Sequence, residues 1–170
     1  MHVLNIYFIP FALILILSAI YFSEPDPRIT YVSFAILFVF FLINRWLSKN
    51  AYKFIKWTSR IRILTVWLNL AAAAALFYLL GSYWAPTWLL FLIPPALAAM
   101  FMKKAQVFLI SLTSLILMLG TYYVKSRLID LPLSSVQWAM ACIHALFVIF
   151  FALFVQAMSE MAVKMRDTLK

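Results

Sequence analysis

The longest uncharged stretch of the chain is residues 63–102, ILTVWLNLAAAAALFYLLGSYWAPTWLLFLIPPALAAMFM. A helix needs about 20 apolar residues to cross the ~30 Å hydrocarbon core of a bilayer. These 40 residues are therefore too many for one crossing. The turn-forming segment GSYWAP, at residues 81–86, lies in the middle of the stretch. The stretch predicts two spans, at residues 63–82 and 86–102, joined by a tight turn.

The rest of the chain has the same apolar character. Of its 170 residues, 67% are apolar and 11% are charged, whereas soluble domains have about 25% charged residues. A soluble fold of this composition would expose very large apolar patches, which excludes the soluble enzyme classes. Four further apolar runs predict spans at residues 3–22, 29–47, 105–124 and 136–157. We therefore expect an all-α, polytopic membrane helix bundle with six transmembrane helices.

Positive charge is divided unequally between the two ends of these spans. Lys and Arg in short loops stay on the cytoplasmic side. Of the 14 basic residues, 11 fall on one side, and the other side has only Arg28, Lys125 and Arg127. Both termini are therefore expected to be cytoplasmic, with residues 158–170 extending the last helix there. Basic residues placed at span borders indicate topology, and we expect no nucleic-acid partner.

A basic segment separates the second and third predicted spans. Lys49, Lys53, Lys56 and Arg60 are spaced 4, 3 and 4 residues apart, which places them on one helical face. Residues 48–62 therefore predict an interfacial helix. One interpretation is that this face binds anionic lipid headgroups or an acidic partner. The other is that the segment only anchors the topology.

Few polar residues lie within the spans, and each has two interpretations. His144 is the one ionisable side chain at bilayer depth, and it either packs as a neutral imidazole or contacts a ligand. Pro94 and Pro95 predict a kink in the fourth span, either static or a hinge beside a cavity. Four neutral side chains either join helices or line a pocket for an apolar small molecule. These are Asn69, Ser111, Ser114 and Gln137.

Catalytic chemistry is not supported by the remaining residues. All five Asp and Glu residues fall in loops or in the C-terminal tail, so no carboxylate pair lies within the membrane. No nucleophile, phosphate-binding or metal motif is present. Cys142 and the two histidines lack metal-ligand spacing. We expect no enzyme, no metal and no cofactor.

An apolar seam runs from the sixth span into the C-terminal tail. Its members repeat at intervals of 4, 3, 4, 3 and 4 residues, as in helices that pair. They are Phe151, Val155, Met158, Ala162, Met165 and Leu169. The seam predicts that the sixth helix continues into the cytoplasm as a rigid rod and pairs with a second copy, which makes a homodimer.

The layout resembles the membrane input region of bacterial multi-span sensor histidine kinases. The resembling segments are the outer turn WAPTW at residues 84–88, the span that follows it to MKKA at residues 102–105, and the exit helix at residues 155–170. The resemblance covers about the last half of the chain. It implies a sensor of a two-component system in the bacterial cytoplasmic membrane, with its cytoplasmic output domain outside this chain.

Two alternatives come from other functional classes. One is a small-solute binding subunit of a membrane transporter, against which stand the lack of buried charge and the near absence of glycine in the spans. The other is a structural subunit of a larger membrane complex, in which the lateral faces of the helices would be contact surfaces.

Overall fold

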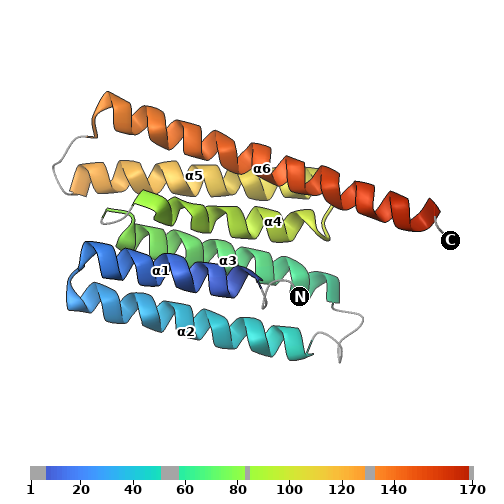
Figure 1. Ribbon diagram of the computed structural model, residues 1–170, viewed down its shortest axis with the longest axis horizontal. Coiled ribbons are helices and arrows are strands. Elements are labelled where there is room, and N and C mark those ends of the chain that lie inside the picture. The colour runs from blue at the N-terminus through green and yellow to red at the C-terminus, as the bar shows by residue number, and fades with distance from the viewer. Residues whose placement is uncertain (1–6, 51–57, 83–84, 129–132, 169–170) are drawn as a thin grey trace. The chain divides into compact units, whose positions relative to one another are not determined.

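The computed structural model describes residues 7–50, 58–82, 85–128 and 133–168, and within these ranges the chain is all-helical with no strand. The predicted all-α class is therefore confirmed. The elements shown in Figure 1 follow in chain order. They are α1 (Ile9–Ser23), α2 (Pro27–Asn50), α3 (Thr58–Leu80), the 3₁₀ helix η3 (Ala85–Leu92), α4 (Ile93–Ala99), α5 (Lys104–Leu128) and α6 (Ser135–Thr168).

Four helices in the described part of the chain are long and apolar enough to cross a membrane. They contain the segments Pro27–Leu47, Ser59–Leu80, Lys104–Leu128 and Ser135–Thr168. The segments Ile9–Ser23 and Ala85–Ala99 are shorter apolar helices. Large apolar side chains are exposed along most of these helices. Such surfaces suit a protein that is surrounded by lipid.

The first interhelical turn is built from capping residues. Glu24, with a φ of 42°, adopts the left-handed conformation and its N–H donates to the carbonyl of Ile20 at 3.1 Å, which ends α1. Asp26 then accepts a hydrogen bond from the N–H of Arg28 through Oδ1 at 2.7 Å. Pro27 occupies the first helical position, where no N–H is required. The turn therefore ends one helix and starts the next.

The chain forms two compact units, divided between Ile93 and Pro94. In the first unit, α2 packs against α3, η3 packs against α3 and α1, and α1 makes fewer contacts with α2. Phe77 of α3 and Phe91 of η3 form the aromatic centre of this unit. Their rings meet edge to face, with centroids 5.4 Å apart and planes at 76°. Both side chains are almost completely buried.

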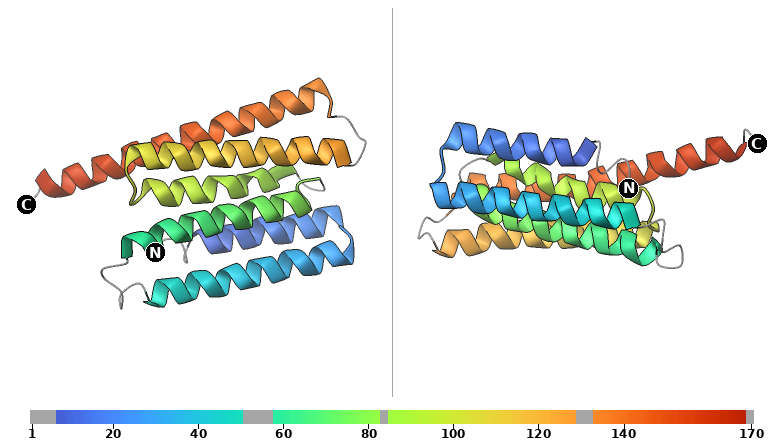
Figure 2. Two further views of the ribbon diagram at one scale, coloured as in Figure 1. Left: turned by 180° about the vertical axis from the view of Figure 1, so that it is seen from behind. Right: turned by 90° about the horizontal axis from the view of Figure 1, so that it is seen from below.

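The second unit is dominated by the contact between α5 and α6. The buried stripe of α6 has residues spaced at helical intervals, and its three alanines let the two helices approach closely. It consists of Ala141, Ala145, Val148, Ala152 and Gln156. With 34 residues, α6 is about 51 Å long at a rise of 1.5 Å per residue. Its C-terminal end continues well past the N-terminal end of α5 (Figure 2).

The fourth predicted span, at residues 86–102, is a 3₁₀ helix followed by an α-helix rather than one kinked α-helix. Pro94 and Pro95 lie in the first turn of α4. Backbone N–H groups in a first turn have no acceptor within the same helix, so the two prolines remove no hydrogen bond that lies within α4 itself. The discontinuity lies just before them, at the change of helix type between Leu92 and Ile93.

The middle of the predicted interfacial helix at residues 48–62 falls outside the described residues. Its first part belongs to α2, which continues to Asn50, and its last part belongs to α3, which begins at Thr58. Residues 51–57, including Lys53 and Lys56, are among those that the structure does not describe.

Gly81 follows α3 at a place where a side chain would collide with Phe77. A Cβ at Gly81 would lie 2.6 Å from the carbonyl oxygen of Phe77 and 2.9 Å from its Cε2 atom. We expect Gly81→Ala to lower the free energy of unfolding by about 1–3 kcal/mol, as overpacking does. At Gly120, inside α5, an added Cβ meets nothing within 4 Å. Gly120→Ala should therefore raise the free energy of unfolding by about 0.5–1 kcal/mol.

The free energy of unfolding of both glycine variants can be measured by reversible unfolding in mixed micelles titrated with sodium dodecyl sulfate. Equal effects of the two substitutions would contradict the close approach of Gly81 to Phe77.

Candidate functional site

A pair of asparagines joins α2 to α3. The amide nitrogen of Asn44 donates to the Oδ1 atom of Asn69 at 3.2 Å, and the amide nitrogen of Asn69 donates to the Oδ1 atom of Asn44 at 3.2 Å. Asn69 also donates to the carbonyl oxygen of Thr65 at 2.7 Å. Asn44 is only 3% exposed. The buried Asn44 and the half-buried Asn69 satisfy each other, which makes the pair a polar junction within an apolar unit.

A small cavity lies against this pair. It has a volume of about 50 Å³ and is bounded by α1, α2, α3 and η3, with Leu90 and Ile93 in its apolar wall. A water molecule needs roughly 10–15 Å³ on this scale. The cavity therefore has room for a few waters or for a small polar group. It is smaller than the ~300 Å³ lower limit of pockets for drug-sized ligands.

An apolar groove lies between α1 and α2. It has a volume of about 560 Å³ and is open on one side. Its walls are entirely apolar and come from Ile9 and Leu13 of α1 and from residues 34–41 of α2. Ile9, Leu37 and Phe41 border both the groove and the asparagine cavity. The two spaces are therefore neighbours, one apolar and one with a polar wall.

Asn69 is the one predicted ligand-binding residue that lines this cavity. Its partner Asn44 was not among the predicted site residues. In the sequence Asn44 lies inside the predicted span at residues 29–47, next to Arg45. Its spacing of seven residues from Leu37, which places both on one face of α2, was the available signal.

Ser111 and Ser114 are completely buried in the second unit. The Ser111 hydroxyl donates to the carbonyl oxygen of Val107 at 2.8 Å, and the Ser114 hydroxyl donates to that of Ile110 at 2.9 Å. Each serine thus bonds to its own helix one turn earlier, as serines in membrane helices commonly do. This arrangement favours packing between helices over a polar pocket.

The other predicted ligand-binding residues also belong to the second unit. His144 is half-buried on α6. Gln137 accepts a hydrogen bond from the N–H of Ser134 at 2.9 Å, and the N–H of Gln137 donates to the Ser134 hydroxyl at 3.3 Å. This is a capping box, so Gln137 has a structural role at the start of α6. Pro94 and Pro95 lie at the start of α4.

The seam residues change from half-buried to exposed along α6. Phe151 and Val155 are half-buried, whereas Met158 and Met165 are 50% and 63% exposed, and Ala162 is exposed. Leu169 lies outside the described residues. Met161 and Val163 are exposed as well, so apolar surface on this part of α6 extends beyond the seam.

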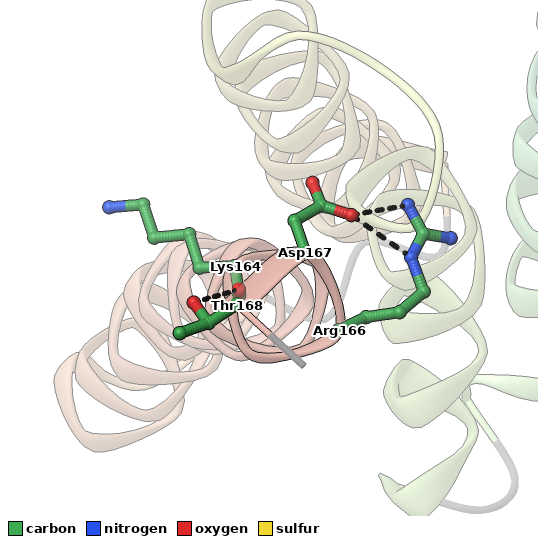
Figure 3. A network of polar contacts seen from close by, with 4 residues as sticks. All are labelled: Lys164, Arg166, Asp167 and Thr168. Atoms are coloured by element: carbon green, nitrogen blue, oxygen red, sulfur yellow. Dashed lines mark hydrogen bonds and ion pairs between the residues drawn. The ribbon is translucent and has the colours of Figure 1, made fainter. Parts of the chain in front are cut away.

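The end of α6 carries its own polar contacts (Figure 3). The Arg166 guanidinium donates to the Oδ1 atom of Asp167 from Nη2 at 3.2 Å and from Nε at 3.3 Å. The Thr168 hydroxyl donates to the carbonyl oxygen of Lys164 at 2.9 Å. All of residues 160–168 are exposed. An exposed ion pair contributes little stability, so the chain's own packing does not support this last part of the helix.

Two of the predicted headgroup-binding residues lie in the described part of the chain. Lys49 is exposed in the last turn of α2, and Arg60 is exposed near the start of α3. Both therefore flank the undescribed segment 51–57. Their positions at helix ends fit the membrane border at which basic residues collect.

Within the described ranges, no three His, Cys, Asp or Glu side chains gather in a way that could hold a metal ion. No protein-family model, curated protein or solved structure matches the chain.

Proposed function

We propose that the protein is a non-catalytic membrane sensor. It perceives an apolar or membrane-associated stimulus and transmits it through α6 to a cytoplasmic output domain of the histidine kinase type that lies outside this chain. The supporting observation is the length of α6, about 51 Å in one uninterrupted helix. A bilayer core takes up only ~30 Å of it. Within the remainder, residues 160–168 are exposed on every side, and this part is suited to carry a displacement to another domain.

The proposed topology has six spans, both termini in the cytoplasm and a location in the bacterial inner membrane. The four long apolar helices and the partition of basic residues support it. The fourth span would be η3 with α4. Eight residues rising about 2.0 Å each and seven rising about 1.5 Å give roughly 27 Å. The 3₁₀ geometry thus lets a short segment nearly cross the bilayer core.

A homodimer is part of the proposal because α6 leaves apolar side chains uncovered. Met158, Ala162 and Met165 would face water on the cytoplasmic side if α6 stood alone. Covering each larger side chain with a second copy contributes on the order of 1.5–3 kcal/mol. That is too little to hold a dimer by itself, so the membrane spans must also contribute.

Cysteine crosslinking tests this function in membranes, in a Cys142→Ala background. We expect Met158→Cys and Met165→Cys to crosslink between chains several times faster than Glu160→Cys and Lys164→Cys, because only the first two lie on the seam. The four positions are all exposed, which makes the second pair a matched control. Equal rates at all four positions, or no crosslinking at any, would contradict a paired α6 and favour the transporter-subunit or complex-subunit alternative.

A further inference from the structure

The groove between α1 and α2 lies where lipid would surround it. Phe34, Phe38 and Phe41 line it from within the candidate span Pro27–Leu47. In a bilayer this wholly apolar surface faces hydrocarbon tails, so an acyl or alkyl chain is the occupant available to it. The loose packing of α1 on α2 leaves the groove unfilled by protein.

The adjoining cavity supplies hydrogen-bonding groups that hydrocarbon cannot use. Within the asparagine pair, both amide hydrogens of Asn69 are used, by Asn44 and by the Thr65 carbonyl. Asn44 keeps one N–H, and each Oδ1 atom keeps a second lone pair. The wall therefore offers a donor and two acceptors to a small group in about 50 Å³. A hydroxyl or a carboxamide matches this set.

We propose that the first unit binds a single-chain amphiphile with an uncharged, hydrogen-bonding head, drawn from the bilayer. Its chain lies in the groove, and its head reaches Asn44 and Asn69 past Ile9, Leu37 and Phe41, which border both spaces. The described walls of both spaces contain no ionisable residue. A carboxylate or phosphate head would therefore be buried without a counter-charge, which is costly.

The proposed ligand gives the sensor function a chemical class of stimulus. Ligand binding does not depend on the proposed sensor function, and only the signalling consequence rests on it. Leu90 and Ile93 line the cavity. The chain passes into the second unit directly after Ile93, one residue beyond the change from η3 to α4. A 3₁₀ stretch within a longer helix often acts as a hinge. Occupancy of the cavity would thus act on the residues that lead to Pro94 and Pro95.

Photolabelling of the full chain in phosphatidylcholine nanodiscs tests the binding. The probe is hexadecan-1-ol with a diazirine on its chain, and labelled sites are mapped by peptide mass spectrometry. We expect labelling on α1 and α2 around the groove. Hexadecan-1-ol and hexadecanamide should compete better than hexadecane, by roughly three- to tenfold for the added hydrogen bonds. Palmitate in its charged form should compete more weakly than either.

Two variants separate binding of the alkyl chain in the groove from binding of the head in the asparagine cavity. Ala35→Trp places a large ring in the groove and should abolish its labelling, whereas Ala139→Trp, at an exposed alanine of α6, should leave the labelling unchanged. Asn44→Leu/Asn69→Leu replaces both amides with apolar side chains of similar size. It should retain the labelling but remove the preference for the alcohol over hexadecane.

The possible outcomes distinguish this inference from the sensor proposal. Labelling spread evenly over the lipid-facing helices, with Ala35→Trp and Ala139→Trp alike, would mean ordinary lipid solvation and overturn the inference. Equal competition by hexadecane and the alcohol in the wild-type chain would overturn the role of the asparagines. If α6 nevertheless crosslinks along its seam, the sensor proposal survives. Specific labelling of the groove without crosslinking along the α6 seam would support the binding site and contradict the sensor proposal.

Discussion

Phe91→Ala is expected to lower the free energy of unfolding by about 3 kcal/mol, the low end of the range for truncating a buried phenylalanine. The Phe91 side chain is fully buried in η3, where its ring meets that of Phe77 edge to face. In a bilayer the removed ring loses little transfer free energy, because lipid is as apolar as the protein interior. The loss therefore comes from the cavity and from the aromatic contact.

A matched control for this substitution is Phe108→Ala on α5. Phe108 is 46% exposed and lies on a helix surface. Its truncation should change the free energy of unfolding by less than about 0.5 kcal/mol, as is usual for surface positions. Unfolding by sodium dodecyl sulfate in mixed micelles gives the free energies of unfolding of the Phe91→Ala and Phe108→Ala variants for comparison. If both variants lost the same stability, η3 would not be held by its contact with α3.

Asn69→Leu alone is expected to be more destabilising than Asn44→Leu/Asn69→Leu. The single substitution removes both hydrogen bonds of the buried Asn44 amide, and an unsatisfied buried polar group costs about 1–3 kcal/mol. The double substitution leaves no such group, so the free energy of unfolding should stay close to that of the wild type.

Thr113→Val is the control for the asparagine variants. Its hydroxyl donates to the carbonyl oxygen of Leu109 at 2.9 Å, at a half-buried position of α5. We expect a change within about 0.5 kcal/mol. The same unfolding titration measures the free energy of unfolding of all three variants. A double variant that is less stable than Asn69→Leu would show that the two amides do not depend on each other.

Much of the helical layout could be predicted from the sequence, because the deciding signals are local. The GSYWAP segment at residues 81–86 predicts the end of α3, and the structure has α3 end at Leu80. The second span is predicted to begin at residue 29, and α2 begins two residues earlier, at Pro27, with Asp26 as its cap. A polar cap, a proline or a glycine acts on the backbone within a few residues, so pattern and structure agree at these places.

The form of the fourth span could not be predicted in the same way. Two adjacent prolines predict a break in an α-helix. Whether they lie inside a helix or in its first turn, however, depends on where that helix starts. The 3₁₀ helix η3 that precedes them packs on α1 and α3. Those contacts join residues far apart in the chain.

The candidate site was predicted only in part, since Asn69 was chosen without Asn44. Their pairing depends on how α2 and α3 face each other, which no local pattern specifies. Gln137 is different, because the capping-box signature Ser134-Ser135-Val136-Gln137 was present in the sequence and favoured a cap over a ligand contact.

The central claim is that α6 leaves the membrane on the cytoplasmic side of a six-span protein. Accessibility of single cysteines to a membrane-impermeant thiol reagent tests it in intact cells, in the Cys142→Ala background. Cysteines replacing Asp26, Ser82 and Ser134 should react from outside, and those replacing Lys103 and Asp167 should react only after the cells are opened. Reaction of the Asp167 position from outside, or an exchange between the Ser82 and Lys103 positions, would contradict the account.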